Sequence, residues 1–180
     1  MNNTITLIGL MGTGKSTIGR LLAARLHIPF ADLDEAIVAR AGKSIPRIFS
    51  EDGECIFRSL EGEVLAELCA DEEAKVLATG GGAILSAPNR KRVQQAGPVI
   101  WLHAAVETLA SRVEGDDNRP LLHGVDPLLK ARELNRKRAP YYEQCANFKV
   151  DTGALDAEQA VDAIAAFLEK WQKGRADSNV

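Results

Sequence analysis

The sequence predicts an α/β fold in which a parallel β-sheet is covered by helices on both faces. Short apolar runs rich in β-branched residues recur along the chain, as expected for buried parallel strands. Longer segments with apolar residues at helical spacing separate these runs. Strands that alternate with helices are typical of parallel sheets, because the helices connect successive strands and cover the sheet.

Five segments are predicted to be strands. Residues 4–10 form the first apolar, β-branched run, which contains a glycine near its end and leads into a glycine-rich turn. The other predicted strands are residues 30–33, 75–79, 98–102 and 147–150.

Helical patterns fill most of the remaining chain. The first predicted helix follows the glycine-rich turn, where Ile18, Leu21, Leu22 and Leu26 form an apolar stripe that ends near Pro29. The other predicted helices are residues 34–41, 54–70, 88–95, 106–113, 127–138 and 156–173. Residues 114–124 fit neither pattern, and their Gly, Asp, Asn and Pro residues predict a surface loop that binds or moves. The polar residues 174–180 are expected to be a disordered tail.

Composition indicates a single globular domain, residues 1–180. The chain is 46% hydrophobic and 26% charged, which excludes a disordered chain and collagen. No apolar run approaches the roughly 18 residues that a membrane helix needs. Residues 1–6 carry no positive charge ahead of an apolar stretch, so a cytoplasmic protein without a membrane partner is expected.

Charge and cysteine content narrow the possible partners further. The formal net charge is −3, which argues against nucleic acid as the main partner. The three cysteines are far apart and odd in number, so neither a disulfide framework nor a Cys-x-x-Cys metal site is expected. Each cysteine is interpreted as a small buried hydrophobic residue: Cys55, Cys69 and Cys145.

The most specific motif is GLMGTGKS, from Gly9 to Ser16, which matches GxxxxGKS between a predicted strand and a predicted helix. Glycines let backbone N–H groups turn toward phosphate oxygens, and the helix N-terminus adds partial positive charge. Lys15 is expected to reach the β- and γ-phosphates, and Ser16 to offer its hydroxyl to Mg²⁺. The alternative is a glycine-rich turn beside an incidental lysine, which the flanking elements disfavour.

Asp32 and Asp34 end the second predicted strand, where open parallel sheets place ligand-facing residues. We expect the two carboxylates to take different tasks at this site. One could anchor a Mg²⁺ shell while the other accepts a hydrogen bond from an acceptor hydroxyl. A helix cap plus a first-turn acid is an equally good interpretation, which Asp34 before a helix would satisfy.

Two further features are ambiguous when taken alone. Arg58 lies on a predicted helix with Glu54 four residues before it and Glu61 three after, which predicts a surface ion pair. Residues 79–82 read Thr-Gly-Gly-Gly after a predicted strand. Three successive glycines cost backbone entropy, so close approach of a ligand is the favoured reason, and a tolerant loop is the alternative.

Arginines in the second half of the chain are candidates for anion binding. Arg119 lies in the predicted loop 114–124, where a cation could close over a nucleotide, although an exposed, screened arginine is the alternative. Residues 130–138 hold five basic residues and one acid, and most of this run is expected to be a solvated helix face. Arg138 ends the run just before a predicted turn at Pro140 and Tyr141, a suitable place for anion recognition.

The motifs together resemble the shikimate kinase family. The matching segments are GLMGTGKST, FADLD, GKSIPRIF, GECIFR followed by Glu61, LATGGGAI, RPLL, and RKRAPYY ahead of NFKVDT. They occur in the family's order across roughly residues 4–153, and the whole set is far more specific than GxxxxGKS alone. The resemblance implies a three-layer P-loop fold of the nucleoside monophosphate kinase type, with strand order 2-3-1-4-5. It also implies a substrate-binding region at residues 33–61 and a mobile lid at residues 114–124.

The resemblance further implies ATP-dependent phosphorylation of the 3-hydroxyl of shikimate, in aromatic amino-acid biosynthesis, by a monomer that uses Mg²⁺. The ATP-binding residues would be Gly12, Thr13, Gly14, Lys15, Ser16, Thr17, Arg112, which would stack on adenine, and Arg119 from the lid. The metal ligands would be Ser16 and, through water, Asp32. The shikimate-binding residues would be Asp34, Arg58, Gly80, Gly81 and Arg138, with the two arginines on the carboxylate. The catalytic residues would be Lys15, Asp34 as candidate base, and Arg119.

One departure and several rival functions accompany this resemblance. Many family members have a proline near the start of the last helix that packs on adenine, whereas residues 151–161 contain none. A kinase of the same fold could instead phosphorylate gluconate or a nucleoside monophosphate. A non-catalytic nucleotide-binding regulator, or a P-loop protein that uses residues 130–138 on nucleic acid, is the rival from a different class.

Overall fold

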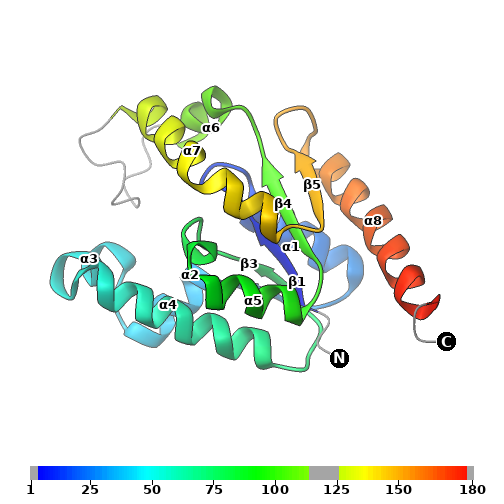
Figure 1. The fold of residues 1–180 in the computed structure, drawn as a ribbon, viewed down its shortest axis with the longest axis horizontal. Coiled ribbons are helices and arrows are strands. Elements are labelled where there is room, and N and C mark those ends of the chain that lie inside the picture. The colour runs from blue at the N-terminus through cyan, green and yellow to red at the C-terminus, as the bar shows by residue number, and fades with distance from the viewer. Residues whose placement is uncertain (1–3, 114–125, 178–180) are drawn as a thin grey trace.

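Five parallel strands form one sheet in the order β2-β3-β1-β4-β5 (Figure 1). The structure, a computed structural model, describes residues 4–113 and 126–177, with side chains through residue 174. The predicted fold class and strand order are confirmed, and each predicted strand is present. The strands are β1 (Ile5–Ile8), β2 (Phe30–Asp32), β3 (Val76–Ala78), β4 (Val99–His103) and β5 (Phe148–Asp151).

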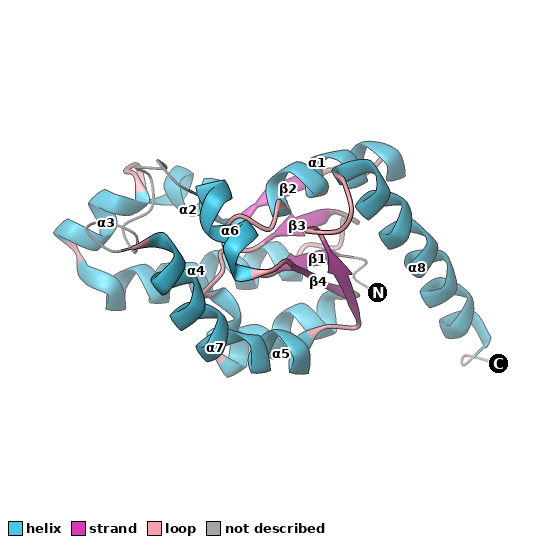
Figure 2. Ribbon diagram, turned by 90° about the horizontal axis from the view of Figure 1, so that it is seen from above, coloured by secondary structure: helices cyan, strands magenta, loops and turns pink. Residues whose placement is uncertain are grey.

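Helices cover both faces of the sheet, so the molecule has three layers (Figure 2). The helices are α1 (Lys15–Leu26), α2 (Leu33–Ala41), α3 (Ile45–Glu51), α4 (Gly53–Ala70), α5 (Ala87–Ala96), α6 (Val106–Val113), α7 (Pro127–Cys145) and α8 (Ala157–Asp177), with a 3₁₀ helix η1 (Ala83–Leu85). Apolar side chains of α1 and α8, such as Leu22 and Ile164, pack on one face. Side chains of α4, α5 and α7, such as Leu65, Val93 and Tyr142, pack on the other. Burial on both faces explains why the strand sequences are almost continuously apolar.

Helix α7 differs most from its prediction, because it continues from Pro127 to Cys145. Pro140 lies inside the helix, so the predicted turn at Pro140 and Tyr141 is wrong. A proline removes one helical N–H and strains the preceding turn. Tyr142 and Cys145, beyond the proline, are each 1% exposed in the core, and this burial offsets the cost of Pro140.

Smaller differences concern α3, the cysteines and the chain end. The sequence patterns did not predict α3, although Ser44 followed by Pro46 is a helix-start signal. Cys69 and Cys145 are buried as expected, but Cys55 is exposed on α4, so its predicted burial is wrong. Helix α8 includes residues 174–177 of the expected tail, and residues 178–180 lie outside the described part. Within the described ranges, no helix is both long and apolar enough to cross a membrane.

Three strands end at one edge of the sheet, and this edge positions the candidate site. β1 leads into the glycine-rich turn, β2 ends at Asp32, and β3 is followed directly by Thr79. Their register aligns Leu7 with Ala78 and Ala78 with Asp32, so the three chain segments leave the sheet together. Ligands of open parallel sheets bind outside this carboxyl edge.

Candidate active site

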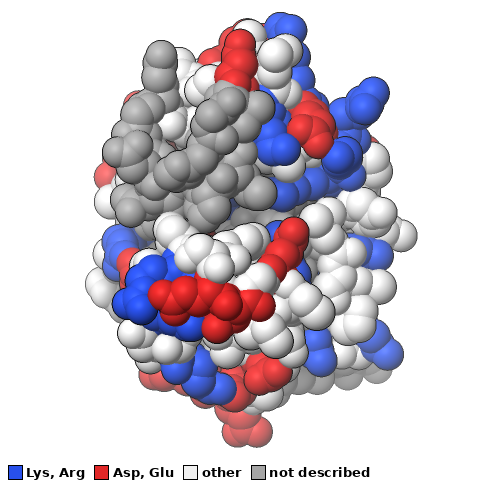
Figure 3. All heavy atoms as spheres, turned by 90° about the vertical axis from the view of Figure 1, so that its left-hand side faces the viewer, with Lys and Arg blue, Asp and Glu red and all other residues white. Residues whose placement is uncertain are grey.

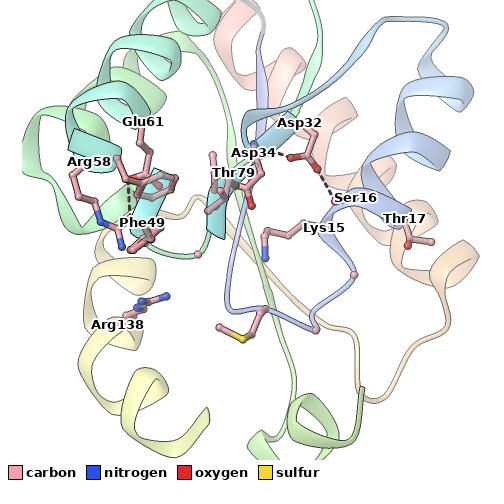
Figure 4. Close-up of a pocket in the computed structure, with 18 of the residues that line it drawn as sticks. Lys15, Ser16, Thr17, Asp32, Asp34, Phe49, Arg58, Glu61, Thr79 and Arg138 are labelled. Atoms are coloured by element: carbon pink, nitrogen blue, oxygen red, sulfur yellow. Dashed lines mark hydrogen bonds and ion pairs between the residues drawn. The ribbon is translucent and has the colours of Figure 1, made fainter. Parts of the chain in front are cut away.

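A cavity of about 420 Å³ lies at the carboxyl edge of the sheet (Figure 4). This volume falls in the range of small-molecule sites. The lining residues come from segments that are far apart in the sequence: the P-loop, the start of α2, α3, α4, the Thr-Gly-Gly-Gly segment, α6 and α7. Of the described side chains predicted to bind ligands, all but Thr13 line it: Lys15, Ser16, Thr17, Asp32, Asp34, Arg58, Arg112 and Arg138, together with Gly12, Gly14, Gly80 and Gly81.

The P-loop, Gly9 to Ser16, is held in shape mainly by contacts between residues that are close in the sequence. Gly12 has φ +79°, a left-handed conformation that side chains disfavour, and an added Cβ would lie 3.0 Å from the Leu109 carbonyl oxygen. Lys15 Nζ donates to the carbonyl oxygens of Gly9, at 2.9 Å, and Leu10, at 2.7 Å. Thr13 is 1% exposed, and its hydroxyl donates to the Leu10 carbonyl at 2.7 Å. The Thr13 side chain therefore shapes the loop from inside, which leaves only its backbone for a phosphate.

Asp32 connects the P-loop to α2. Ser16 Oγ donates to Asp32 Oδ2 at 2.7 Å, and Asp32 Oδ1 accepts the backbone N–H of Asp34 at 3.0 Å, so Asp32 caps α2 (Figure 4). The alternative of a helix cap plus a first-turn acid is therefore present in the structure, with Asp32, where the strand ends, rather than Asp34 as the cap. Asp34 lies in the first turn of α2 and lines the cavity. A hydroxyl and a carboxylate within hydrogen-bond distance are oxygen ligands of the kind that Mg²⁺ prefers.

The three glycines after β3 make room for side chains of the site. A Cβ on Gly80 would lie 2.8 Å from Asp34 Oδ1. A Cβ on Gly81 would lie 3.2 Å from Arg138 Nη1, and one on Gly82 would lie 2.6 Å from Arg58 Nη1. Lack of a side chain at these positions therefore lets a carboxylate and two guanidiniums approach the backbone closely. The predicted close approach is made here by the protein's own groups.

Arg58 is paired with two carboxylates. Its Nη1 lies 2.9 Å from Glu61 Oε2, and its Nη2 lies 3.1 Å from Glu54 Oε1. Glu54 is exposed, as expected for a surface pair, whereas Glu61 is 2% exposed and lines the cavity. Burial raises the pKa of Glu61 above its ordinary value, although the nearby Arg58 opposes this shift. The predicted surface pair is therefore only the outer half of an arrangement that orients Arg58 toward the cavity.

Arg138 faces the same cavity from α7 (Figure 4). It is 6% exposed, and its guanidinium lies close to the backbone of Gly81. The other basic residues of the run 130–138 behave differently, because several of them form surface ion pairs. Lys130 and Lys137 both pair with Glu133, and Arg132 pairs with Glu107. On the face shown in Figure 3, Lys and Arg side chains are likewise interspersed with Asp and Glu.

Arg112 joins the P-loop to the segment between β5 and α8. Its Nη1 donates to the Gly12 carbonyl at 3.3 Å, and its Nη2 donates to the Thr152 carbonyl at 2.8 Å. Gly12 and Arg112 both line the cavity, at the end where a nucleotide is expected. Arg119 and the predicted lid 114–124 lie outside the described residues.

The sequence patterns missed the apolar lining of the cavity. Ile45 and Phe49 reach it from α3, Phe57 from α4, and Met11 from the P-loop. The Phe49 and Phe57 ring centroids lie 4.6 Å apart. Ordinary hydrophobic periodicity cannot separate such residues from core residues, and α3 itself was not predicted. Aromatic side chains beside a few charged groups are typical of pockets for small organic molecules.

A P-loop beside a pocket with two arginines and an acid defines a kinase of the P-loop class with a small-molecule acceptor. The family model described as shikimate kinase matches residues 11–169. The chain belongs to the shikimate kinase family, and with it to the ATP-dependent phosphotransferases of the shikimate pathway.

Individual relatives agree with this assignment. The chain is 44% identical over 171 residues to a shikimate kinase of Symbiobacterium thermophilum, with 94% of this chain and 96% of the relative covered. It is 45% identical over 168 residues to the Pseudomonas syringae enzyme, with 93% and 96% covered. The structure of Acinetobacter baumannii shikimate kinase in complex with shikimate has a TM-score of 0.90 and 40% identity, with 94% of each chain covered. A Sinorhizobium meliloti gluconokinase, at TM-score 0.62 and 18% identity, shares the fold.

Proposed function

We propose that this cavity transfers the γ-phosphoryl group of ATP to the 3-hydroxyl of shikimate, with the phosphates on the P-loop and shikimate against α2, α4 and α7. One observation carries the proposal: the cavity joins Lys15 and the α1 N-terminus to Asp34, Arg58 and Arg138. Phosphoryl transfer asks a protein mainly for positioning and charge neutralisation, and these groups supply both.

The phosphate side would neutralise the charge of ATP. Lys15 would contact the β- and γ-phosphates, and the backbone N–H groups of residues 12–17 would surround the phosphate oxygens. Ser16 and, through water, Asp32 would hold Mg²⁺, and their mutual hydrogen bond supports this pairing. Bound Mg²⁺ would neutralise charge on the β- and γ-phosphates. Arg112 would contact adenine, and Arg119 would approach ATP from the lid.

The acceptor side would recognise a small hydroxylated carboxylate. Arg58 and Arg138 would bind the carboxylate, in charge-assisted hydrogen bonds that contribute about 1.5 to 3 kcal/mol each. The backbone of Gly80 and Gly81 would approach the ring of the substrate. A phosphorylated acceptor would require more cations on this side of the cavity, which favours shikimate over a nucleoside monophosphate.

Asp34 would accept a hydrogen bond from the hydroxyl that attacks the γ-phosphorus. In a loose transition state the hydroxyl proton leaves late, so orientation by Asp34 contributes more than proton abstraction. The close approach of Asp34 to Gly80 supports this role, because it puts the carboxylate at the wall on which the ring would rest.

A coupled assay of ADP release tests the proposal, with shikimate, gluconate and AMP compared as acceptors at equal concentration. ADP release that requires shikimate is expected, together with phosphorylation at the 3-hydroxyl in the NMR spectrum of the product. Turnover with gluconate or AMP, and none with shikimate, would overturn the assignment.

The proposal also includes a cytoplasmic monomer without a nucleic-acid or membrane partner. The ion pairs within residues 130–138 support this, because acids offset much of the run's positive charge. Light scattering at several protein concentrations checks the oligomeric state. Titration of DNA and RNA at low salt checks for nucleic-acid binding, and salt-sensitive binding would contradict this part of the proposal.

A further inference from the structure

Tyr142 is a buried residue of α7 to which the proposed reaction gives no role. It lies four residues after Arg138, one helical turn further along the same face. Its side chain is 1% exposed, and the ring stacks on Trp101, with centroids 5.8 Å apart and an angle of 29° between the planes. The ring is therefore fixed by the core, and its hydroxyl points toward the wall of the cavity.

The Tyr142 hydroxyl joins two groups of the acceptor side. It donates to the Gly81 carbonyl oxygen at 2.6 Å, and it is hydrogen-bonded to the Arg138 guanidinium. A guanidinium can only donate, so the polarity of both bonds is fixed: Arg138 donates to the phenol oxygen, and the phenol donates to Gly81. Burial raises the pKa of Tyr142 to about 12, although the nearby Arg138 opposes this shift, so the phenol keeps its proton at neutral pH.

Three separate chain segments converge at this hydroxyl. A Cβ built on Gly81 would lie 3.2 Å from Arg138 Nη1, 3.3 Å from the Gly9 carbonyl oxygen and 3.5 Å from Tyr142 Oη. Gly9 also accepts a hydrogen bond from Lys15. The hydroxyl thus lies where α7, the glycine segment after β3 and the start of the P-loop meet.

The chemistry of the two arginines explains why a phenol suits this position. Arg58 is oriented by the carboxylates of Glu54 and Glu61, which offset its charge. Tyr142 orients Arg138 without adding a negative charge, so that the guanidinium keeps its attraction for an anion. A carboxylate in place of the phenol would compete with the substrate.

We propose that Tyr142 is a positioning residue for shikimate, because its hydroxyl holds the Arg138 guanidinium and the Gly81 backbone in the arrangement that the substrate binds. This role rests on the proposed function, since it concerns the same pocket. Contacts that act equally on bound substrate and transition state change KM and leave kcat alone. Loss of the hydroxyl should therefore weaken shikimate binding without slowing the bound complex.

Tyr142→Phe is the variant that tests this role, because it removes the hydroxyl and keeps the ring on Trp101. We expect the KM for shikimate to rise about tenfold, in line with loss of one hydrogen bond to a charged group. The KM for ATP and kcat should each stay within about twofold. A merely structural role would give a different result, because partial unfolding lowers apparent kcat and leaves the shikimate KM unchanged.

Tyr141→Phe is the matched control. Tyr141 is the preceding residue, it is 39% exposed, and its ring lies under Arg90 rather than at the cavity. This control should keep the shikimate KM of the wild-type protein. Shikimate turnover by the wild-type protein is measured first, and its absence would remove the proposed function. An unchanged shikimate KM in Tyr142→Phe, beside an active wild type, would overturn the role of Tyr142 alone.

Two further measurements follow the coupling itself. If Tyr142 acts through Arg138, the two substitutions should not act independently. The fold-increase in shikimate KM of the Tyr142→Phe, Arg138→Lys double variant should then be smaller than the product of the fold-increases of the two single variants. A fold-increase equal to that product would overturn the proposal.

Fluorotyrosine can also replace both tyrosines in the wild-type chain, so that the test does not depend on the folding of a variant. The ¹⁹F signal of Tyr142, assigned with Tyr141→Phe, should shift on addition of shikimate, and a constant signal would contradict the role.

Discussion

The two sides of the cavity are built in different ways. On the phosphate side, the side chains of Lys15 and Thr13 bond to carbonyls of Gly9 and Leu10, at most six residues away. On the acceptor side, Arg58 has local ion pairs with Glu54 and Glu61, but other contacts join distant segments, as in the Tyr142 bond to Gly81, 61 residues earlier. The P-loop itself is thus a local motif that forms with β1 and α1, and Asp32 and Arg112 contact it from other segments. The acceptor side exists only once α2, α4 and α7 have assembled.

This difference separates the two chemical tasks. Contacts between neighbours can keep the phosphate-binding loop unchanged while the helices around the acceptor vary. Substitutions on the acceptor side should therefore change shikimate kinetics and leave ATP binding intact, and substitutions in the P-loop should do the reverse.

Replacement of Asp34 by Asn should have the largest effect. The amide keeps the size of the side chain and the start of α2, but it loses the negative charge that orients the acceptor hydroxyl. We expect kcat to fall by about two to four orders of magnitude, because the attacking hydroxyl loses the group that orients it and accepts its hydrogen bond. Steady-state kinetics measures this loss, and circular dichroism should show an unchanged fold.

Glu35→Gln is the control for that variant, because Glu35 is the next residue of α2 and pairs with Arg20 on the surface. Its kcat should equal that of the wild-type protein. Near-normal turnover in Asp34→Asn would leave Asp34 with only the helix-start role that the sequence also allowed.

Arg138→Lys should have the next largest effect. Lysine keeps the charge but loses the planar fork that binds a carboxylate through two parallel hydrogen bonds. A loss of about 1.5 to 3 kcal/mol corresponds to a shikimate affinity roughly 10 to 100 times weaker. Calorimetry with shikimate and, separately, with an ATP analogue measures both sides of the cavity. Arg136→Lys, at an exposed position of the same helix, is the control. Unchanged shikimate affinity in Arg138→Lys would remove Arg138 from the pocket.

The same difference between the two sides decides what the sequence could predict. GLMGTGKS specifies the P-loop by itself, since its contacts are local, and alternation of strands and helices was enough for the fold class. Arg58 looked like a surface charge when taken alone, and Arg138 was a candidate for binding an unspecified anion, so only the resemblance joined the two in one pocket. Glu61 was noted as an ion-pair partner, but its burial beside Asp34 arises from the packing of α4 against α2. Helix α7 was predicted too short, because Pro140 suggested a turn. The burial of Tyr142, which keeps the helix going past the proline, is not visible in any local sequence pattern.

Thr13→Val should have a smaller effect, on the phosphate side only. Valine keeps the shape of the buried side chain and loses the hydroxyl that donates to the Leu10 carbonyl. A lost buried hydrogen bond costs about 1 to 3 kcal/mol, which urea unfolding measures. The distorted loop should raise the KM for ATP a few-fold and leave the shikimate KM unchanged. An equal rise in both KM values would contradict the separation of the two sides.

The smallest expected effect is a pH dependence of stability that arises from Glu61. Burial raises the pKa of this carboxyl above its ordinary value near 4.5, with the Asp34 charge adding to the shift and Arg58 and Arg138 opposing it. The folded state then binds the proton more tightly than the unfolded state. Stability from this group is therefore fully present below pH 4.5 and is lost as pH rises through the raised pKa. Urea unfolding between pH 4 and 7 should show the wild-type free energy of unfolding falling relative to that of Glu61→Gln.

The pKa of Glu133, on α7, is shifted in the opposite direction to that of Glu61. Its ion pairs with Lys137 and Lys130 lower its pKa to about 2, so its contribution is present above pH 4.5 and is lost as pH falls through the lowered pKa. The Glu133 pairs are solvent-exposed and screened, so Glu133→Gln should change the free energy of unfolding little. High salt should remove even this small difference from the wild-type protein. The Glu61 effect should persist in high salt, because the carboxyl is buried beside the cavity. If the two variants respond alike to pH and salt, the Glu61 carboxyl is not buried, and the contrast between the pocket and the outer face of α7 is lost.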